Sequence, residues 1–213
     1  MRLPDTPVVA LLGDLIRSRE AVDRRALHQA LVSALAEADR ARPALAAPAV
    51  VVGDEFQGVY ATVGAALEAT HRIRLALAGI GEVRFGLGRG EVFPLDEGGL
   101  LQDGSAWWAA RDAIMAVEEA AQHASRAALR TGLVAAEPAT FRPAVRAATA
   151  AIDLALARLD ATSQRILLGI VGGRRQSEIA GELGLTPQAV NQRVLRHGLG
   201  VLADAMRQLW EEP

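Results

Sequence analysis

Short apolar runs of strand length alternate with longer segments of helical periodicity over the first two thirds of the chain, and this alternation limits the folds open to it. The expected strands cover residues 7–12, 49–52, 56–60, 82–92 and 130–135, and the expected helices cover residues 21–41, 63–77 and 103–122. Gly53, Asp54 and Glu55 separate the second and third strands, which predicts a tight hairpin. The order β-α-β-β-α-β-α-β predicts an α+β sandwich, with helices on one face of the sheet.

A second, all-helical unit is expected after the sheet. Pro138 and Pro143 interrupt the chain, so we place a domain boundary near residue 140. Residues 1–140 would form the sheet domain, and residues 141–213 would form a linker helix followed by an all-α helix-turn-helix domain.

Residues 176–190 have the spacing of a helix-turn-helix motif. Ala180 is small where two steeply crossing helices would approach, Gly184 suits the turn, and Val190 would pack the second helix onto the first. Thr186 and Pro187 are suited to begin that second helix. The segment 162–209 resembles the helix-turn-helix of sigma-factor region 4.

The polar side chains around this motif are suited to DNA. Amide and guanidinium groups bind base edges and phosphates in a major groove. The expected DNA contacts are Arg174, Arg175, Gln188, Asn191, Gln192, Arg193 and Arg196. Residues 158–213 carry seven arginines against six Asp and Glu residues, a mild basic excess that fits a nucleic-acid partner without requiring one. A module that contacts only protein is the alternative.

The composition excludes several classes of protein. With 213 residues, 51% of them hydrophobic, and no cysteine, the chain is neither a disordered tail nor a disulfide scaffold. All 23 basic residues are arginine, so chemistry that requires a lysine is excluded. Because the sequence contains no long uninterrupted apolar stretch and no secretory signal pattern, we expect a cytoplasmic protein without a membrane partner.

Two carboxylates are expected at neighbouring strand ends. Asp14 follows the first strand and Asp54 lies at the hairpin tip, so pairing of these strands would bring them together. Divalent cations such as Mg²⁺ bind oxygen ligands, often one or two carboxylates together with substrate phosphates. The sequence therefore predicts a site for Mg²⁺ or Mn²⁺. Each aspartate taken alone could instead be an ordinary turn residue.

Four ordered motifs of the first domain resemble class III nucleotide cyclases and the related GGDEF diguanylate cyclases. They are Asp14-Leu15, Gly53-Asp54, the strand element from Gly86 to Val92, and Ala109-Ala110-Arg111. The resemblance implies a ferredoxin-like, palm-type domain of the cyclase type. It implies metal binding by Asp14, the Leu15 carbonyl and Asp54, and a charge-stabilising catalytic role for Arg111 on phosphate. We also expect nucleotide contacts from Glu55, Arg89 and Trp107.

The sequence departs from the cyclases at positions that handle the nucleotide. The lysine that reads the base is Val50 here, a helix asparagine is Trp107, and no lysine exists to hold the terminal phosphates. The identity of the nucleotide and its turnover therefore stay open.

In whole-chain layout the sequence resembles the SatD family of bacterial proteins. The matching motifs are Gly13-Asp14 to Ser18-Arg19, Gly53-Asp54-Glu55-Phe56-Gln57-Gly58, Arg84-Phe85-Gly86-Leu87-Gly88 and residues 103–111, followed by the terminal helix-turn-helix. This resemblance implies the architecture more than the mechanism.

Three hypotheses follow from these patterns. The first is a DNA-binding transcriptional regulator of the SatD type, whose cyclase-like domain senses a metal and a nucleotide. We expect it to be a homodimer, because helix-turn-helix proteins commonly bind paired half-sites. The second is an active metal-dependent nucleotidyl cyclase, and the third is a dimeric interaction protein with a vestigial site.

Overall fold

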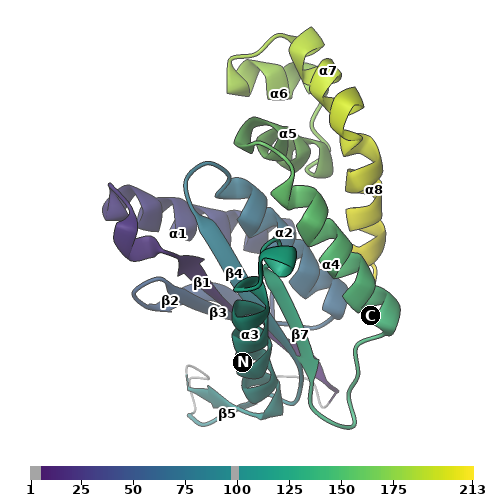
Figure 1. The fold of residues 1–213 in the computed structure, drawn as a ribbon. Coiled ribbons are helices and arrows are strands. Elements are labelled where there is room, and N and C mark those ends of the chain that lie inside the picture. The colour runs from purple at the N-terminus through teal and green to yellow at the C-terminus, as the bar shows by residue number, and fades with distance from the viewer. Residues whose placement is uncertain (1–5, 97–100) are drawn as a thin grey trace.

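The main sheet has five strands in the order β2-β3-β1-β4-β7 (Figure 1). The computed structural model describes residues 6–96 and 101–213. The strands of the sheet are β1 (Val8–Ile16), β2 (Ala46–Val52), β3 (Glu55–Tyr60), β4 (Glu82–Gly90) and β7 (Thr131–Ala135); β5 (Phe93–Pro94) and β6 (Gln102–Asp103) form a separate ribbon. The first four strands of the sheet pair antiparallel, and β7 pairs parallel to β4. The predicted α+β fold is confirmed, and the order β2-β3-β1-β4 is that of a ferredoxin-like sandwich.

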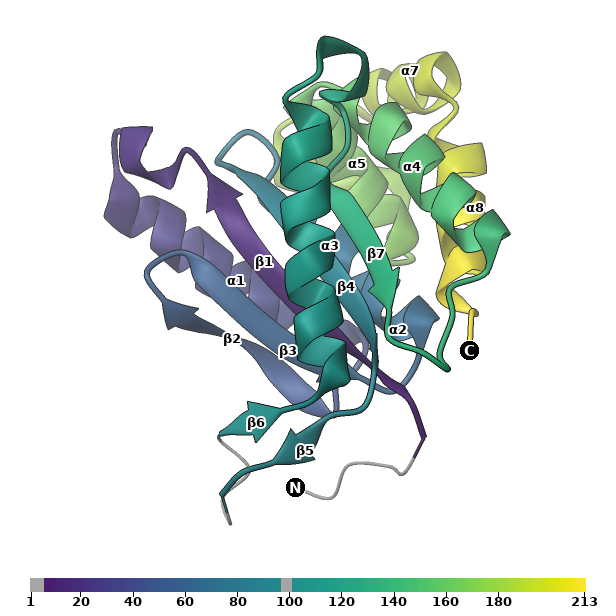
Figure 2. The same cartoon turned by 60° about the horizontal axis from the view of Figure 1, so that its bottom comes forward.

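Helices cover both faces of this sheet. The helices that alternate with the strands are α1 (Arg24–Ala41), α2 (Val63–Ala76) and α3 (Ser105–Ala121), with short 3₁₀ turns η1 (Ser18–Glu20) and η2 (Ala124–Arg126). Phe85 and Leu87 of β4 point into the core shared with α1 and α2, whereas Gly86 and Gly88 face α3. Figure 2 shows α3 crossing one face of the sheet, with α1 and α2 behind it. The expectation that helices cover only one face is wrong for α3.

The alternating glycines of β4 allow α3 to pack directly on the strand. A Cβ atom at Gly88 would lie 2.0 Å from the Ala106 carbonyl oxygen, and one at Gly86 would lie 2.2 Å from that of Ala110. These distances are far below van der Waals contact, so the two positions require the absence of a side chain. The alternate glycines of β4 are therefore explained by the close approach of α3 to the strand backbone.

Five helices follow the sheet (Figure 1). They are α4 (Pro143–Ala157), α5 (Ala161–Val171), α6 (Gln176–Leu183), α7 (Pro187–His197) and α8 (Leu199–Trp210). Two of the five helices, α5 and α8, pack against α2. Their buried side chains belong to the same hydrophobic cluster as those of α1, α2 and the sheet. No helix of the described residues combines the length and the apolar character needed to cross a membrane.

The end of α8 is fixed to α2 by a buried hydrogen bond. The Trp210 Nε1–H donates to His71 Nδ1 at 2.9 Å, and both side chains are buried. Burial lowers the pKa of His71 to about 3, so the imidazole is neutral at physiological pH and can accept this hydrogen bond. Gly64 allows the close approach, because a Cβ atom there would lie 2.0 Å from the Trp210 carbonyl oxygen.

A buried ion pair joins α2, α4 and β7. The Arg74 guanidinium lies 2.5 Å from Asp153, whose side chain also accepts hydrogen bonds from the backbone N–H groups of Arg130 at 2.8 Å and Thr131 at 2.9 Å. Burial raises the pKa of Asp153, and Arg74 and the two backbone donors oppose that rise. Because these partners satisfy the buried carboxylate, its position also fixes the start of β7.

We expect Gly88→Ala to destabilise the protein by about 2 kcal/mol or more, because the added methyl group would collide with the backbone of α3. Gly181→Ala is the matched control: it lies in α6 with open space around its Cβ position, and should be neutral or stabilise by up to about 1 kcal/mol. Equilibrium unfolding in urea measures both changes. Equal stability of the Gly88→Ala variant and the unmodified protein would contradict the close packing of α3.

Candidate functional site

Asp14 and Glu55 face each other across two paired strands. In the β1–β3 register Gly13 lies opposite Phe56, so the next pair along the strands is Asp14 and Glu55. Both line a cavity of about 250 Å³ on the α3 side of the sheet. The charged residues that line this cavity, here called the Asp14 cavity, are Asp14, Glu55, Arg84, Arg111 and Glu118. Segments far apart in the sequence therefore meet in one ionic site.

The Asp14 carboxylate is incompletely neutralised. Its Oδ2 atom lies 3.9 Å from the Arg84 guanidinium, which pairs more closely with Glu118 at 2.8 Å. Its Oδ1 atom is buried and has no hydrogen-bond partner among the described residues. Burial raises the pKa of Asp14; Arg84 opposes the rise, and nearby carboxylates, Glu118 first, add to it. A buried carboxylate oxygen without a partner is costly unless something else binds it.

Asp54 belongs to the turn between β2 and β3, and its charge adds to the raised pKa of Asp14. It accepts a short hydrogen bond from the Ser18 hydroxyl and lines a different cavity together with Leu15 and the first turns of α1. The side chain of Leu15 is itself buried in the core. Asp14 and Asp54 therefore line different cavities, although the charge of Asp54 still acts on Asp14, and Glu55 is the hairpin carboxylate that lines the cavity of Asp14. Metal binding by Asp14 and Asp54 together stays a prediction. No cluster of three or more His, Asp or Glu side chains suited to a metal ion occurs within residues 6–96 and 101–213.

Two of the other predicted ligand residues lie near the Asp14 cavity, and one does not. Arg111 lines both this cavity and a neighbouring one of about 400 Å³, which Trp107 also lines. The buried Nε1 atom of Trp107 has no hydrogen-bond partner in the described part of the chain. Arg89 lies at the opposite end of β4 from Arg84, where its guanidinium donates to the Thr140 carbonyl at 2.9 Å.

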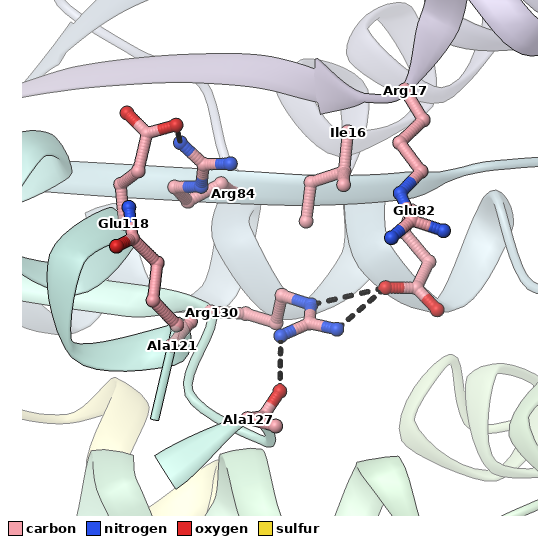
Figure 3. A pocket seen from close by; sticks show the side chains of 9 residues that line it. Ile16, Arg17, Glu82, Arg84, Glu118, Ala121, Ala127 and Arg130 are labelled. Carbon is pink, nitrogen blue, oxygen red and sulfur yellow. Dashed lines mark hydrogen bonds and ion pairs between the residues drawn. The ribbon is translucent and has the colours of Figure 1, made fainter. Parts of the chain in front are cut away.

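Three charged residues of this region were not expected from the sequence. Arg84, Glu118 and Arg130 line a third cavity of about 690 Å³, which shares Arg84 and Glu118 with the Asp14 cavity (Figure 3). Arg84 could have been predicted from the sequence, because strand alternation and the β1–β4 pairing place it directly opposite Asp14. Glu118 and Arg130 depend on where α3 crosses the sheet, which no local pattern specifies.

The helix-turn-helix forms as the motif spacing predicts. Gly184 ends α6 in the left-handed region with a φ of 65°, and the Thr186 hydroxyl accepts from the Ala189 N–H at 3.1 Å at the start of α7. Ala180 and Val190 are buried between the two helices. Val190 is the one fully buried residue of α7, so most of that helix surface is available for contacts.

The predicted DNA contacts divide into exposed residues and residues already engaged within the protein. Gln188, Asn191, Gln192, Arg196 and Arg175 are exposed. Arg193 binds Asp160 at 2.6 Å and the Ser163 hydroxyl at 3.1 Å, which holds α7 against the start of α5. Arg174 forms an ion pair with Glu182 on α6. Arg193 and Arg174 thus have partners within the protein, and their contacts with DNA stay a prediction.

The fold and site define a class of protein: an α+β domain with ionic cavities on its α3 face, followed by a helix-turn-helix. The model of the SatD family matches residues 8–205, which include β1, both hairpin strands and most of α8. The chain therefore belongs to the SatD family. No curated protein matches the sequence.

We expect Asp14→Asn to raise the stability of the protein at neutral pH, because burial makes the charged carboxylate unfavourable there. When folding raises the pKa of a carboxyl group, the protein becomes less stable as the pH rises from the ordinary pKa of that group, here 3.8, through its pKa in the folded state. The gain should therefore shrink as the pH falls toward 3.8. Thermal unfolding at several pH values measures it, with the exposed Glu119→Gln of α3 as the control. A lower melting temperature for Asp14→Asn at neutral pH would contradict this account.

Proposed function

We propose that this protein is a DNA-binding regulator in which the helix-turn-helix contacts DNA and the cavities of the α3 face bind a small ligand. The observation that carries the proposal is the surface of α7. This helix is anchored through buried Val190, and it presents a continuous set of exposed hydrogen-bonding side chains: Gln188, Asn191, Gln192 and Arg196. Amides and guanidinium groups at such positions recognise base edges in the major groove.

A homodimer would present two α7 helices to paired half-sites. Exposed apolar side chains of the sheet domain support such a contact: Trp108 and Met115 of α3 are 64% and 60% exposed, and Val51 of β2 is 49% exposed. Val51 and Met115 both line the Asp14 cavity. A second copy on this surface would bury apolar side chains that a monomer leaves in water.

We expect the protein to enrich a defined sequence from a pool of random duplexes, and Arg196→Ala and Gln192→Ala to weaken binding to that sequence by about 1–3 kcal/mol each. Arg196→Ala should also flatten the dependence of affinity on salt if the side chain contacts a phosphate. Fluorescence anisotropy titrations at several salt concentrations measure both effects. Arg40→Ala, an exposed arginine on α1 away from α7, is the control.

Arg193→Ala is expected to act differently, because it removes the contacts to Asp160 and Ser163. Its main effect should be a lower melting temperature of the protein. Failure to enrich any sequence, together with binding unaffected by Arg196→Ala, would contradict the DNA-binding proposal and favour a protein partner for α7.

The ligand proposed for the Asp14 cavity is a nucleotide that arrives with a divalent cation. Asp14 and Glu55 offer carboxylate oxygens on one side, one of them buried without a partner, and Arg111 offers a guanidinium to phosphate on the other. Two carboxylates suffice for Mg²⁺ or Mn²⁺ when phosphate and water complete the coordination. The ion would neutralise phosphate charge, and the residues of the cavity would position the phosphates.

Mn²⁺ and a nucleoside triphosphate together should raise the melting temperature, whereas neither alone should have a comparable effect. Asp14→Asn should abolish this ligand-dependent shift, and Glu119→Gln should keep it. Each shift is compared with the same variant without ligand, because the unliganded stabilities differ. A shift retained in Asp14→Asn would contradict the site. Release of pyrophosphate in these mixtures would establish the alternative function, a nucleotidyl cyclase.

A further inference from the structure

The largest of these cavities lies where β1 ends and β4 and β7 begin. Its volume is about 690 Å³, within the range of small-molecule sites. Its lining comes from the end of β1, the start of β4, the last turns of α3 and the loop before β7 (Figure 3). Five of the residues that line it are charged: Arg17, Glu82, Arg84, Glu118 and Arg130. We call it the Arg17 cavity.

Two arginines of this cavity are largely buried, whereas their glutamate partners are exposed. The side chains of Arg84 and Arg130 are only 13% and 18% exposed, while those of Glu118 and Glu82 are 55% and 65% exposed. Arg130 is also fixed by hydrogen bonds to the carbonyl oxygens of Ala127 at 2.6 Å and Leu129 at 2.9 Å. An incoming anion could therefore replace the exposed carboxylates without moving the guanidinium groups.

Arg17 adds a third guanidinium that has no partner. It follows β1 and extends into the same space (Figure 3), and no hydrogen bond or ion pair of its side chain is found in the described part of the chain. Its backbone has a φ of 54°, in the left-handed region that residues other than glycine rarely adopt. A strained backbone that holds an unpaired cation at a cavity is a feature of ligand-binding positions.

We propose that the Arg17 cavity binds the phosphate groups of a small phosphorylated molecule. Three arginines line the cavity, one of them without a partner among the described residues, and the planar guanidinium forks match phosphate oxygens in pairs of hydrogen bonds. Glu82 and Glu118 occupy the guanidinium groups until the phosphate displaces them. The site shares Arg84 and Glu118 with the Asp14 cavity, but it needs neither a metal ion nor DNA, so it does not depend on the function proposed above.

The test is calorimetric titration of the full-length protein with inorganic pyrophosphate in buffer containing EDTA. The unmodified protein should bind, and Arg17→Gly should lose about tenfold or more in affinity, as expected when charge-assisted hydrogen bonds are removed. Glycine accepts the left-handed conformation, so the variant should melt at the same temperature as the unmodified protein or higher. Arg19→Ala, which removes an exposed arginine two residues away and outside the cavity, should bind normally.

Neutralising Glu82, the carboxylate that pairs with Arg130, tests whether Glu82 competes with phosphate for this arginine. A purely structural ion pair would not predict tighter binding of pyrophosphate in such a variant. Glu82→Gln should bind pyrophosphate more tightly than the unmodified protein, because Arg130 no longer has an internal anion to release. No binding by the unmodified protein, or equal affinity of Arg17→Gly, would overturn the proposal. Citrate binding as tight as that of pyrophosphate would overturn the assignment to phosphate in favour of a carboxylate ligand.

Discussion

The two-residue alternation of β1, β3 and β4 is the constraint on which the rest of the structure depends. These strands are buried on both faces, so each successive residue serves a different neighbour. On β4 this rule sends Phe85 to α1 and α2 and Gly86 to α3. On β1 and β3 it sends Asp14 and Glu55 to the α3 side and leaves Asp54 with Ser18. The chemistry of the Asp14 cavity therefore depends on strand register, because a slip of one residue would turn its carboxylates to the opposite face of the sheet.

Much of the fold could be predicted from the sequence because its signals are local. The hairpin turn at Gly53, the left-handed turn at Gly184 and the α7 start at Thr186 are each determined by a few adjacent residues, and the structure has all three. The face of the sheet that α3 covers is a long-range property. Gly86 and Gly88 leave space for a close neighbour without specifying which element it is, so all the helices were expected on a single face of the sheet.

The candidate site was predictable to the same limited degree. The pairing of β1 with the hairpin could be expected from the sequence, whereas Arg111 of α3 was expected only from the cyclase resemblance. Which hairpin carboxylate shares a cavity with Asp14 depends on the register of β3 to within one residue. The sequence motif emphasised Asp54, the residue beside the turn glycine. The contributions of Glu118 and Arg130 come from the end of α3 and the loop after it, and their positions follow from packing over the whole sheet. Ionic clusters built from distant segments leave no periodic pattern.

A series of contacts joins the Arg17 cavity to the helix-turn-helix. Arg130 lines the cavity with its side chain, while its backbone N–H binds Asp153 of α4, and Asp153 is held in turn by Arg74 of α2. The pair of Glu82 and Arg130 also borders a neighbouring cavity of about 470 Å³, whose far wall is formed by Leu159 and Ala161 at the start of α5. Arg193 of α7 is bound to Asp160 at this same junction. A series of polar contacts therefore extends from Arg130 at the cavity, along α4 and the start of α5, to the helix α7.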